Sequence, residues 1–259
     1  MVQPQTFSRA KLADYLACRR RFQLRYLERR AWPIAPLAGQ AEEARTLGQR
    51  FHLRLQRHFL YMPLVEEAED DPASHSWWRR FVDQGPILPA GQRFAEYSLT
   101  VPISQSQLIG RFDLLVFGED GVTIFDWKTD ARPRPAAELS QVLQSRLYLA
   151  LVVEGSAAWG EAISADRVRL TYWFVNDPTA TVTIPYNQAR HERNWADLLD
   201  LVVEIESQVV TQENWPLTDD LARCEKCAYT AYCGRLVTVQ DASSWLEETM
   251  AGQLEPELP

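Results

Sequence analysis

Two acidic residues and a lysine lie in two hydrophobic stretches, residues 108–117 and 122–129, that are joined by a Gly-Glu-Asp-Gly turn. A tight turn centred between the Glu and the Asp pairs residues whose numbers sum to 239, which sets Asp113 directly opposite Asp126. Cross-strand neighbours have Cβ atoms roughly 4.5–5.5 Å apart, and like charges at that distance are destabilising. Two carboxylates held so close usually hold a cation between them. Lys128 lies two residues beyond Asp126 and projects from the same face, so the three side chains outline a metal-dependent site for phosphodiester cleavage.

The rest of this face supports the predicted register. Leu115 faces Ile124 and Phe117 faces Val122, so the face is apolar next to the turn and charged at its far end. A shift of one residue would move every one of these side chains to the other face of the sheet. The alternative interpretation is an exposed strand end whose charges are solvated.

Composition and charge distribution limit the class of protein. The 259 residues, 46% hydrophobic and 24% charged, are ordinary for a globular protein. No apolar run is long enough to span a bilayer and the first residues lack a signal-peptide pattern, so we expect a cytoplasmic location. The net charge is −8, yet residues 1–57 carry twelve Lys/Arg and four Asp/Glu, a net of +8. A basic half on an acidic protein is a candidate phosphate-binding face, although charge runs are often only solvated helix surface.

The pattern of apolar residues predicts one α/β domain over residues 1–240, followed by an acidic tail over 241–259. We expect, in order, a helix capped by Ser8 and running to about residue 30, a helix over 40–61, a connector insertion over 62–92 with a short helix near 76–82, a strand over 93–101, the hairpin, a helix over 136–153, strands over 167–175 and 179–184, and a helix over 188–210. Phe94, Glu96 and Ser98 should share one side of their strand. This order indicates a mixed central sheet flanked by helices, with a helical N-terminal elaboration.

The chain contains four cysteines, Cys18, Cys224, Cys227 and Cys233. Two structural disulfides are not expected in a reducing compartment, and four thiolates suit either zinc or an iron–sulfur cluster. One short knuckle plus a distant lone cysteine favours iron–sulfur, but the spacing does not decide between them. Free thiols are the third possibility. If all four cysteines bind one centre, that centre joins the two ends of the chain. Without it, the entropic cost of closing so long a loop would have to be met by other contacts.

Together these features resemble the PD-(D/E)XK nuclease superfamily, in particular its RecB-like branch with an iron–sulfur cluster, which includes the AddB nuclease domain and the CRISPR-adaptation nucleases. The resemblance extends from Phe7 to Cys233 and implies a restriction-endonuclease-like core. It rests on residues 7–22 with the first cysteine, Gly48-x-x-x-His52, Gly110-x-x-Asp113, Asp126-x-Lys128, Gln144-x-x-x-Tyr148 and the C-terminal cysteines. Each motif alone is weak, but their joint order is specific.

The resemblance assigns roles to these residues. It implies that Asp113, Asp126, the Trp127 carbonyl and His52 bind Mg²⁺ or Mn²⁺, and the imidazole favours Mn²⁺. Glu96 is a further acidic ligand, a neighbour of the ligands, or a surface residue. All four cysteines would hold one 4Fe–4S cluster, with zinc as the alternative.

The same resemblance places Lys128 at the attacking water or the charged transition state, and it is one of three lysines against twenty-four arginines. Gln144 and Tyr148, one helical turn apart, would lie near this lysine and the substrate phosphate. The candidate DNA contacts are Arg19, Arg20, Arg21 and Arg111, and Trp77-Trp78-Arg79-Arg80 could stack single-stranded bases.

The sequence therefore predicts a Mg²⁺- or Mn²⁺-dependent deoxyribonuclease, an exonuclease directed at single strands or DNA ends, in repair, recombination or CRISPR adaptation. The alternative is a non-cleaving iron–sulfur DNA-binding subunit that partners a helicase or an integration complex. The presence of Asp113, Asp126 and Lys128 argues against that alternative.

Overall fold

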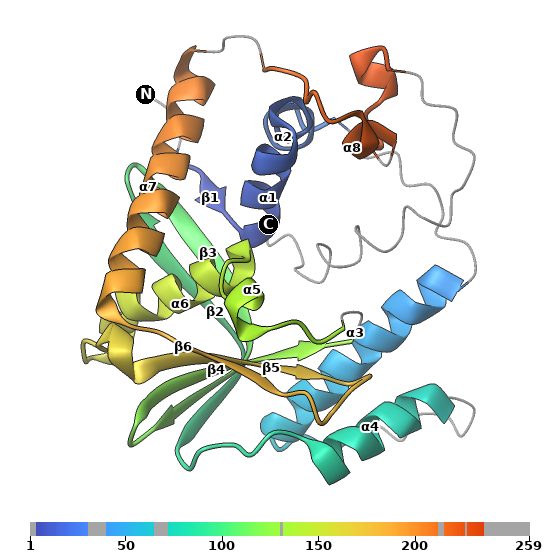
Figure 1. Cartoon of the computed structure of the whole chain (residues 1–259), viewed down its shortest axis with the longest axis vertical. Helices are drawn as coiled ribbons and strands as arrows, with labels where there is room; N and C mark the ends of the chain where they lie inside the picture. Colours follow the sequence, from blue (N-terminus) through green and yellow to red (C-terminus); the bar gives the residue numbers. More distant parts are fainter. Residues whose placement is uncertain are drawn as a thin grey trace.

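The computed structural model describes residues 4–30, 40–64, 72–129, 132–211, 215–225 and 227–235. One mixed sheet of six strands crosses the molecule with helices on both of its faces (Figure 1), which confirms the predicted α/β class. The expected acidic tail lies outside the described residues. Within the described part of the chain, no helix is long and apolar enough to cross a membrane.

The N-terminal segment is more divided than the sequence predicts. It comprises β1 (Thr6–Phe7), α1 (Arg9–Ala17), α2 (Arg19–Phe22) and a π-helix, η1 (Gln23–Leu27). Ser8 caps α1 as expected, accepting a hydrogen bond from the Lys11 N–H. The single helix expected to residue 30 breaks at Cys18, whose backbone is extended, with φ of −164° and ψ of 113°. Buried Asp14 then forms ion pairs with Arg21 and Arg25, which hold the later turns against α1.

Helices α3 (Gln40–Phe59) and α4 (Pro72–Gln84) cover one face of the sheet. The bounds of α3 agree with the predicted helix over 40–61. Helix α4 is longer than the short helix expected near 76–82, and it begins at a proline, which is favoured at the first helical position.

The sheet confirms the predicted hairpin. Its remaining strands are β2 (Gln92–Ile103), β3 (Ser106–Gly118), β4 (Gly121–Lys128), β5 (Val168–Phe174) and β6 (Val182–Pro185). Strands β3 and β4 pair from Leu114↔Phe125 to Gly118↔Gly121, the register that the two-residue turn requires. Strand β4 is parallel to β5 and antiparallel to β3, so the sheet is mixed.

Helix α6 (Leu143–Glu154) covers the other face, backed by α7 (Gln188–Thr211). The single helix predicted over 136–153 is interrupted after α5 (Ala136–Leu139), and Ser145 Oγ caps that break by donating to the Leu139 carbonyl. The short elements are η2 (Ser156–Trp159), η3 (Ala165–Arg167), α8 (Leu221–Glu225) and η4 (Ala231–Cys233). Helix α8 lies near α2 in Figure 1, so the two ends of the described chain meet.

Strand β3 changes its partner halfway along one edge. Strand β2 occupies the other edge along residues 106–117, so β1 and β4 share this one. Strand β4 pairs with residues 114–118, and β1 pairs with Gln107 and Leu108. Residues 109–113 therefore have no strand partner on that edge, and Asp113 stands where the sheet opens.

Gly110 lets α6 approach this part of β3, which generates a first prediction. A Cβ atom there would lie 2.6 Å from Cδ1 of the fully buried Leu151 and 3.4 Å from Cε1 of Tyr148. We expect Gly110→Ala to lower the free energy of unfolding by about 1–3 kcal/mol through overpacking, measured by urea denaturation. Combined with Leu151→Ala, it should cost less than the sum of the two single changes. Strict additivity would contradict a clash with Leu151.

Candidate metal centre and active site

The side chains of strands β2 and β3 switch from one face of the sheet to the other at Glu96 and Asp113. On β3, Phe112 and Leu115 both pack in the α6-side core, although strict alternation would place them on opposite faces. On β2, Phe94 and Tyr97 do the same. The register is nevertheless the same before and after, with Ala95↔Leu114 and Tyr97↔Phe112. Neither strand gains a residue, so both reverse their faces at the Glu96–Asp113 pair.

This reversal corrects two details of the predicted geometry. Phe94 does not share a side with Glu96, because Phe94 packs in the α6-side core and Glu96 faces the other way. Glu96 adopts the left-handed backbone region, with φ of +51°, which is uncommon for a residue other than glycine. The second correction concerns Asp113, which does not simply share the α6 face with Asp126, because its side chain reaches α3 on the other side of the sheet.

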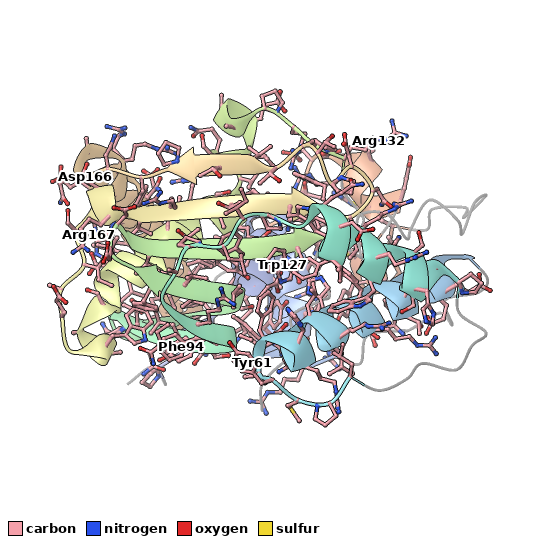
Figure 2. The ribbon with its side chains drawn as sticks, turned by 90° about the horizontal axis from the view of Figure 1, so that it is seen from below. Tyr61, Phe94, Trp127, Arg132, Asp166 and Arg167 are labelled. Atoms are coloured by element: carbon pink, nitrogen blue, oxygen red, sulfur yellow. The ribbon has the colours of Figure 1, made fainter. Side chains whose placement is uncertain are left out.

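His52, Glu96 and Asp113 come together at this point. One ligand atom from each lies within 4.8 Å of the other two. His52 Nδ1 is 3.4 Å from Asp113 Oδ1, and the Trp127 N–H donates to Asp113 Oδ2 at 2.7 Å. Figure 2 shows Trp127 near the middle of the sheet. The Arg111 guanidinium donates to Glu96, so this acid already has one cationic partner.

Helix α3 holds His52 over the sheet because its apolar side is buried. Phe51, Leu55 and Phe59 pack in the core between α3 and the strands. Gly48, one turn before His52, has no side chain between the helix and the strand end, since a Cβ atom there would lie 3.1 Å from Thr129 Oγ1. In the spacing Gly48-x-x-x-His52, the glycine thus lets α3 approach the end of β4 closely, and the candidate metal ligand His52 follows one helical turn later.

Asp126, Lys128 and Gln144 form a closed polar triangle on the α6 side. Lys128 Nζ lies 2.8 Å from Asp126 Oδ1 and donates to Gln144 Oε1 at 2.8 Å. The Gln144 amide in turn donates to Asp126 Oδ2. Lys128 Nζ also lies 5.1 Å from the centre of the Tyr172 ring. Helix α6 thereby fixes the orientation of the ammonium group.

The ionisable groups of the site have pKa values shifted in different directions by burial and by one another. Burial raises the pKa of Asp126 and that of Glu96, and the nearby Asp113 carboxylate raises both further. Burial would also raise the pKa of Asp113, but His52 and the Trp127 N–H outweigh it and hold the pKa of Asp113 below its ordinary value. Burial alone would lower the pKa of His52, whereas Asp113 raises it overall. In the metal-free protein Asp113 thus favours the protonated form of His52, and His52 favours the ionised form of Asp113.

The residues fit a divalent cation. Carboxylate oxygens suit Mg²⁺ and Mn²⁺, and imidazole suits the transition metal. Within the part of the chain that the structure describes, His52 Nε2 is buried and has no hydrogen-bond partner. An imidazole bound to a metal would lose its extra proton, so binding must release protons and strengthen as the pH rises.

Other predicted site residues lie in different surroundings. Tyr148 is buried, with its ring 4.9 Å from that of Phe112. Trp77 packs edge-on against Phe51 and Trp78 stacks on Phe81, so both indoles contribute to the α3–α4 core. These contacts leave less of each ring for base stacking than the sequence alone suggests.

The predicted DNA-binding arginines have acidic partners within the protein. Arg19 pairs with Glu204, Arg20 with Glu28 at 3.2 Å, and Arg21 with Asp14 at 2.6 Å. Arg111 pairs with Glu96. A DNA contact by any of these side chains would require exchange of an internal partner for a phosphate.

The four cysteines gather where the chain ends meet, and none forms a disulfide. Burial raises the pKa of Cys227, and the charges of Cys18 and Cys233 raise it further. The Arg235 guanidinium donates to Cys224 Sγ at 3.1 Å. Tyr229, between the cysteines, donates to the Arg30 carbonyl at 3.2 Å and ties this segment to the N-terminal helices. Four thiols of this kind can serve as the ligand set of one metal centre.

Comparisons with known proteins identify the family of this chain. The family model described as the PD-(D/E)XK nuclease superfamily matches residues 6–234, and the chain belongs to this superfamily. A solved protein from Eubacterium rectale, named "Putative exonuclease", aligns with 85% of this chain and 86% of its own at 10% identity and a TM-score of 0.50. The crystal structure of SSO0001 aligns over 92% of this chain and 90% of that one, at 13% identity and a TM-score of 0.45. None of the curated proteins matches this chain.

The opposed pKa directions generate a second prediction, for protein kept in EDTA. Glu96→Gln should raise the melting temperature near pH 7, because the raised pKa means that ionising Glu96 destabilises the fold. That benefit should vanish near pH 4, below the unfolded pKa of about 4.3. Asp113→Asn should lower the melting temperature near pH 7, because a lowered pKa stabilises the fold at higher pH.

Shifts of a few degrees are expected, since about 2–4 °C corresponds to 1 kcal/mol in a domain of this size. These directions differ from what carboxylate repulsion between Asp113 and Asp126 alone would give, because His52 and the Trp127 N–H favour the ionised form of Asp113. Equal shifts of the same sign for both variants would contradict the charge arrangement described here.

The cysteine arrangement generates a third prediction. Cys18→Ser should lower the melting temperature before it lowers any activity, because Cys18 lies at the N-terminal helices and the other three thiols at the far end of the chain. Limited proteolysis should then cut more readily within residues 211–240. Ser207→Ala, at an exposed position on α7, is a control of similar size outside the cysteine group. An unchanged melting temperature for Cys18→Ser in anaerobically prepared protein would show that the cysteine group does not stabilise the contact between the two ends of the chain.

Proposed function

We propose that this protein is a metal-dependent deoxyribonuclease that hydrolyses phosphodiester bonds, an exonuclease directed at single strands or DNA ends. The observation that carries the proposal is the placement of the Asp126–Lys128–Gln144 triangle beside the His52, Glu96 and Asp113 group. The superfamily supplies the reaction class. DNA repair, recombination or CRISPR adaptation is the setting that the RecB-like resemblance favours.

Asp113, Asp126, His52 and the Trp127 carbonyl would hold Mg²⁺ or Mn²⁺, with Glu96 as an additional acidic ligand. A bound divalent ion would supply Lewis-acid stabilisation of the charge that develops on the phosphate oxygens. His52 favours Mn²⁺, since imidazole binds transition metals better than Mg²⁺.

Lys128 would act on the attacking water or on the charged transition state. Its ammonium group is held by Asp126 and by Gln144 Oε1, so it needs little reorganisation when negative charge develops. Gln144 keeps that orientation because its amide also donates to Asp126. Tyr148, one turn further along α6, would support the helix at this point through its packing on Phe112.

The cysteines would hold one 4Fe–4S cluster with a structural role. The asymmetric spacing and the meeting of both chain ends support a single centre, and zinc is the alternative. Metal analysis of protein made and kept without oxygen separates them. About four irons per chain support the cluster, one zinc without iron supports a zinc centre, and four titratable free thiols without metal contradict both.

A non-cleaving DNA-binding subunit of a helicase or integration complex is the second candidate. It would need no oriented ammonium group. Lys128 is buried to about four fifths of its side chain and has two polar partners, an arrangement that binding alone does not require.

A fourth prediction tests the proposed reaction. End-labelled single- and double-stranded DNA should be cleaved with Mn²⁺ or Mg²⁺ and not in EDTA. Lys128→Ala and Asp126→Ala should each reduce the rate by at least 10²-fold, the lower end of what a positioned charged group contributes to catalysis. Glu138→Ala, an exposed acid on α5, is the matched control and should leave the rate unchanged. Cleavage by Asp126→Ala protein at nearly the unchanged rate would refute the site.

A further inference from the structure

Two arginines follow the strand that carries Asp126 and Lys128. Strand β4 ends at Lys128, and the sequence Arg-Pro-Arg-Pro occupies residues 132–135 before α5 begins. Figure 2 shows Arg132 beyond the end of the sheet. Each proline fixes its own φ and restricts the residue before it, so both arginines stand on a backbone with few conformations.

Arg132 and Arg134 differ from the other arginines considered for DNA binding. Both are exposed, and neither forms an ion pair or hydrogen bond with any residue that the structure describes. Arg19, Arg20, Arg21 and Arg111 all have carboxylate partners. An unpaired guanidinium can bind a phosphate without first losing an internal contact.

The short helix that follows Arg134 is held beside the proposed catalytic residues, because Ser145 Oγ donates to the Leu139 carbonyl and lies 2.8 Å from the Tyr172 hydroxyl. Tyr172 is the β5 partner of Asp126, and Lys128 Nζ lies 5.1 Å from its ring centre. Burial and the charge of Asp126 raise the pKa of Tyr172, and the positive charges of Arg9 and Arg134 act against that rise. The end of β4 is itself fixed, since Asn176 donates to the Thr129 carbonyl at 2.9 Å. The arginine pair therefore extends from a rigid strand end next to the catalytic lysine.

We propose that Arg132 and Arg134 bind the backbone phosphate next to the scissile one on a single-stranded segment of the substrate. This inference rests on the proposed nuclease function and adds a specificity for that site. Guanidinium groups match the geometry of phosphate oxygens and can bind them through two hydrogen bonds. A backbone restricted by proline loses less entropy on binding, so a short segment can position the strand.

The first experiment measures binding of a fluorescein-labelled 20-nucleotide single strand in EDTA, where no cleavage is expected. Arg132→Gln/Arg134→Gln should weaken binding about tenfold at 0.1 M salt. It should also reduce the slope of log affinity against log salt concentration by about 0.7, since one phosphate contact on a single strand contributes about that much. Arg132→Lys/Arg134→Lys should retain most of that slope, because the charge remains.

The matched control is Arg193→Gln, which removes an exposed arginine from α7 on the outside of the helix layer and should change neither quantity. All variants should melt at the temperature of the unaltered protein. A glutamine pair that binds like Arg193→Gln overturns the inference. A lysine pair that loses the salt dependence as fully as the glutamine pair also overturns it, because the salt slope of a phosphate contact depends on the charge that lysine keeps.

A second experiment locates the contact. A methylphosphonate that replaces the phosphate next to the scissile one should weaken binding by the unaltered protein and have no effect on the glutamine pair. In cleavage assays the glutamine pair should raise KM with little change in kcat. If the unaltered protein cleaves no DNA with any divalent metal, the proposed function fails. If it cleaves, and the glutamine pair keeps the same KM, only the phosphate contact fails.

Discussion

The facing carboxylates of Glu96 and Asp113 are the constraint on which the rest of the site depends. The β2–β3 ladder skips the Glu96–Asp113 pair, and the β3–β4 ladder ends one residue before Asp113. Strands β2 and β3 both reverse their faces here without a change of register. Glu96 adopts an unfavourable backbone conformation there, which typically costs about 1–3 kcal/mol. Neither the strain nor the charge repulsion stabilises a metal-free fold. A cation at this point, whether His52 in the protonated form that Asp113 favours or a bound divalent ion, would account for both.

The surrounding elements each place one component around that opening. The change of partner on β3 leaves residues 109–113 without a strand neighbour on one edge, between the segments that pair with β1 and β4. Helix α3 brings His52 from one face, and α6 brings Gln144 from the other. Gly48 and Gly110 matter because they let these two helices approach the strands closely. The site is thus assembled across the sheet rather than on one of its faces.

The hairpin could be predicted from the sequence because its information is local. Glycines flank a two-residue turn, and apolar residues alternate on either side, so the register from Leu114↔Phe125 to Gly118↔Gly121 followed from counting. The predicted pairing of Asp113 with Asp126 does not form, because the pairing of β3 with β4 ends at Leu114 and Asp113 accepts from the Trp127 N–H instead. The position of Glu96 also follows from a two-residue turn, at Ser104–Gln105, but that turn contains no Gly, Asn or Pro to mark it. The reversal at Glu96 and the break at Cys18 could not be predicted, since both depend on tertiary partners. Trp77 and Trp78 were assigned a possible stacking role because sequence does not reveal which aromatic rings a neighbouring helix covers.

The central claim is that the opening of the sheet at Asp113 is a divalent-metal site. Anomalous diffraction at the manganese edge, from crystals grown with Mn²⁺, tests it most directly. We expect a manganese peak at coordination distance from a His52 nitrogen and from an Asp113 carboxylate oxygen, and no such peak in Asp113→Asn crystals grown in the same way. A protein that cleaves DNA with Mn²⁺ while its manganese binds elsewhere, with His52 still paired to Asp113, would contradict the account.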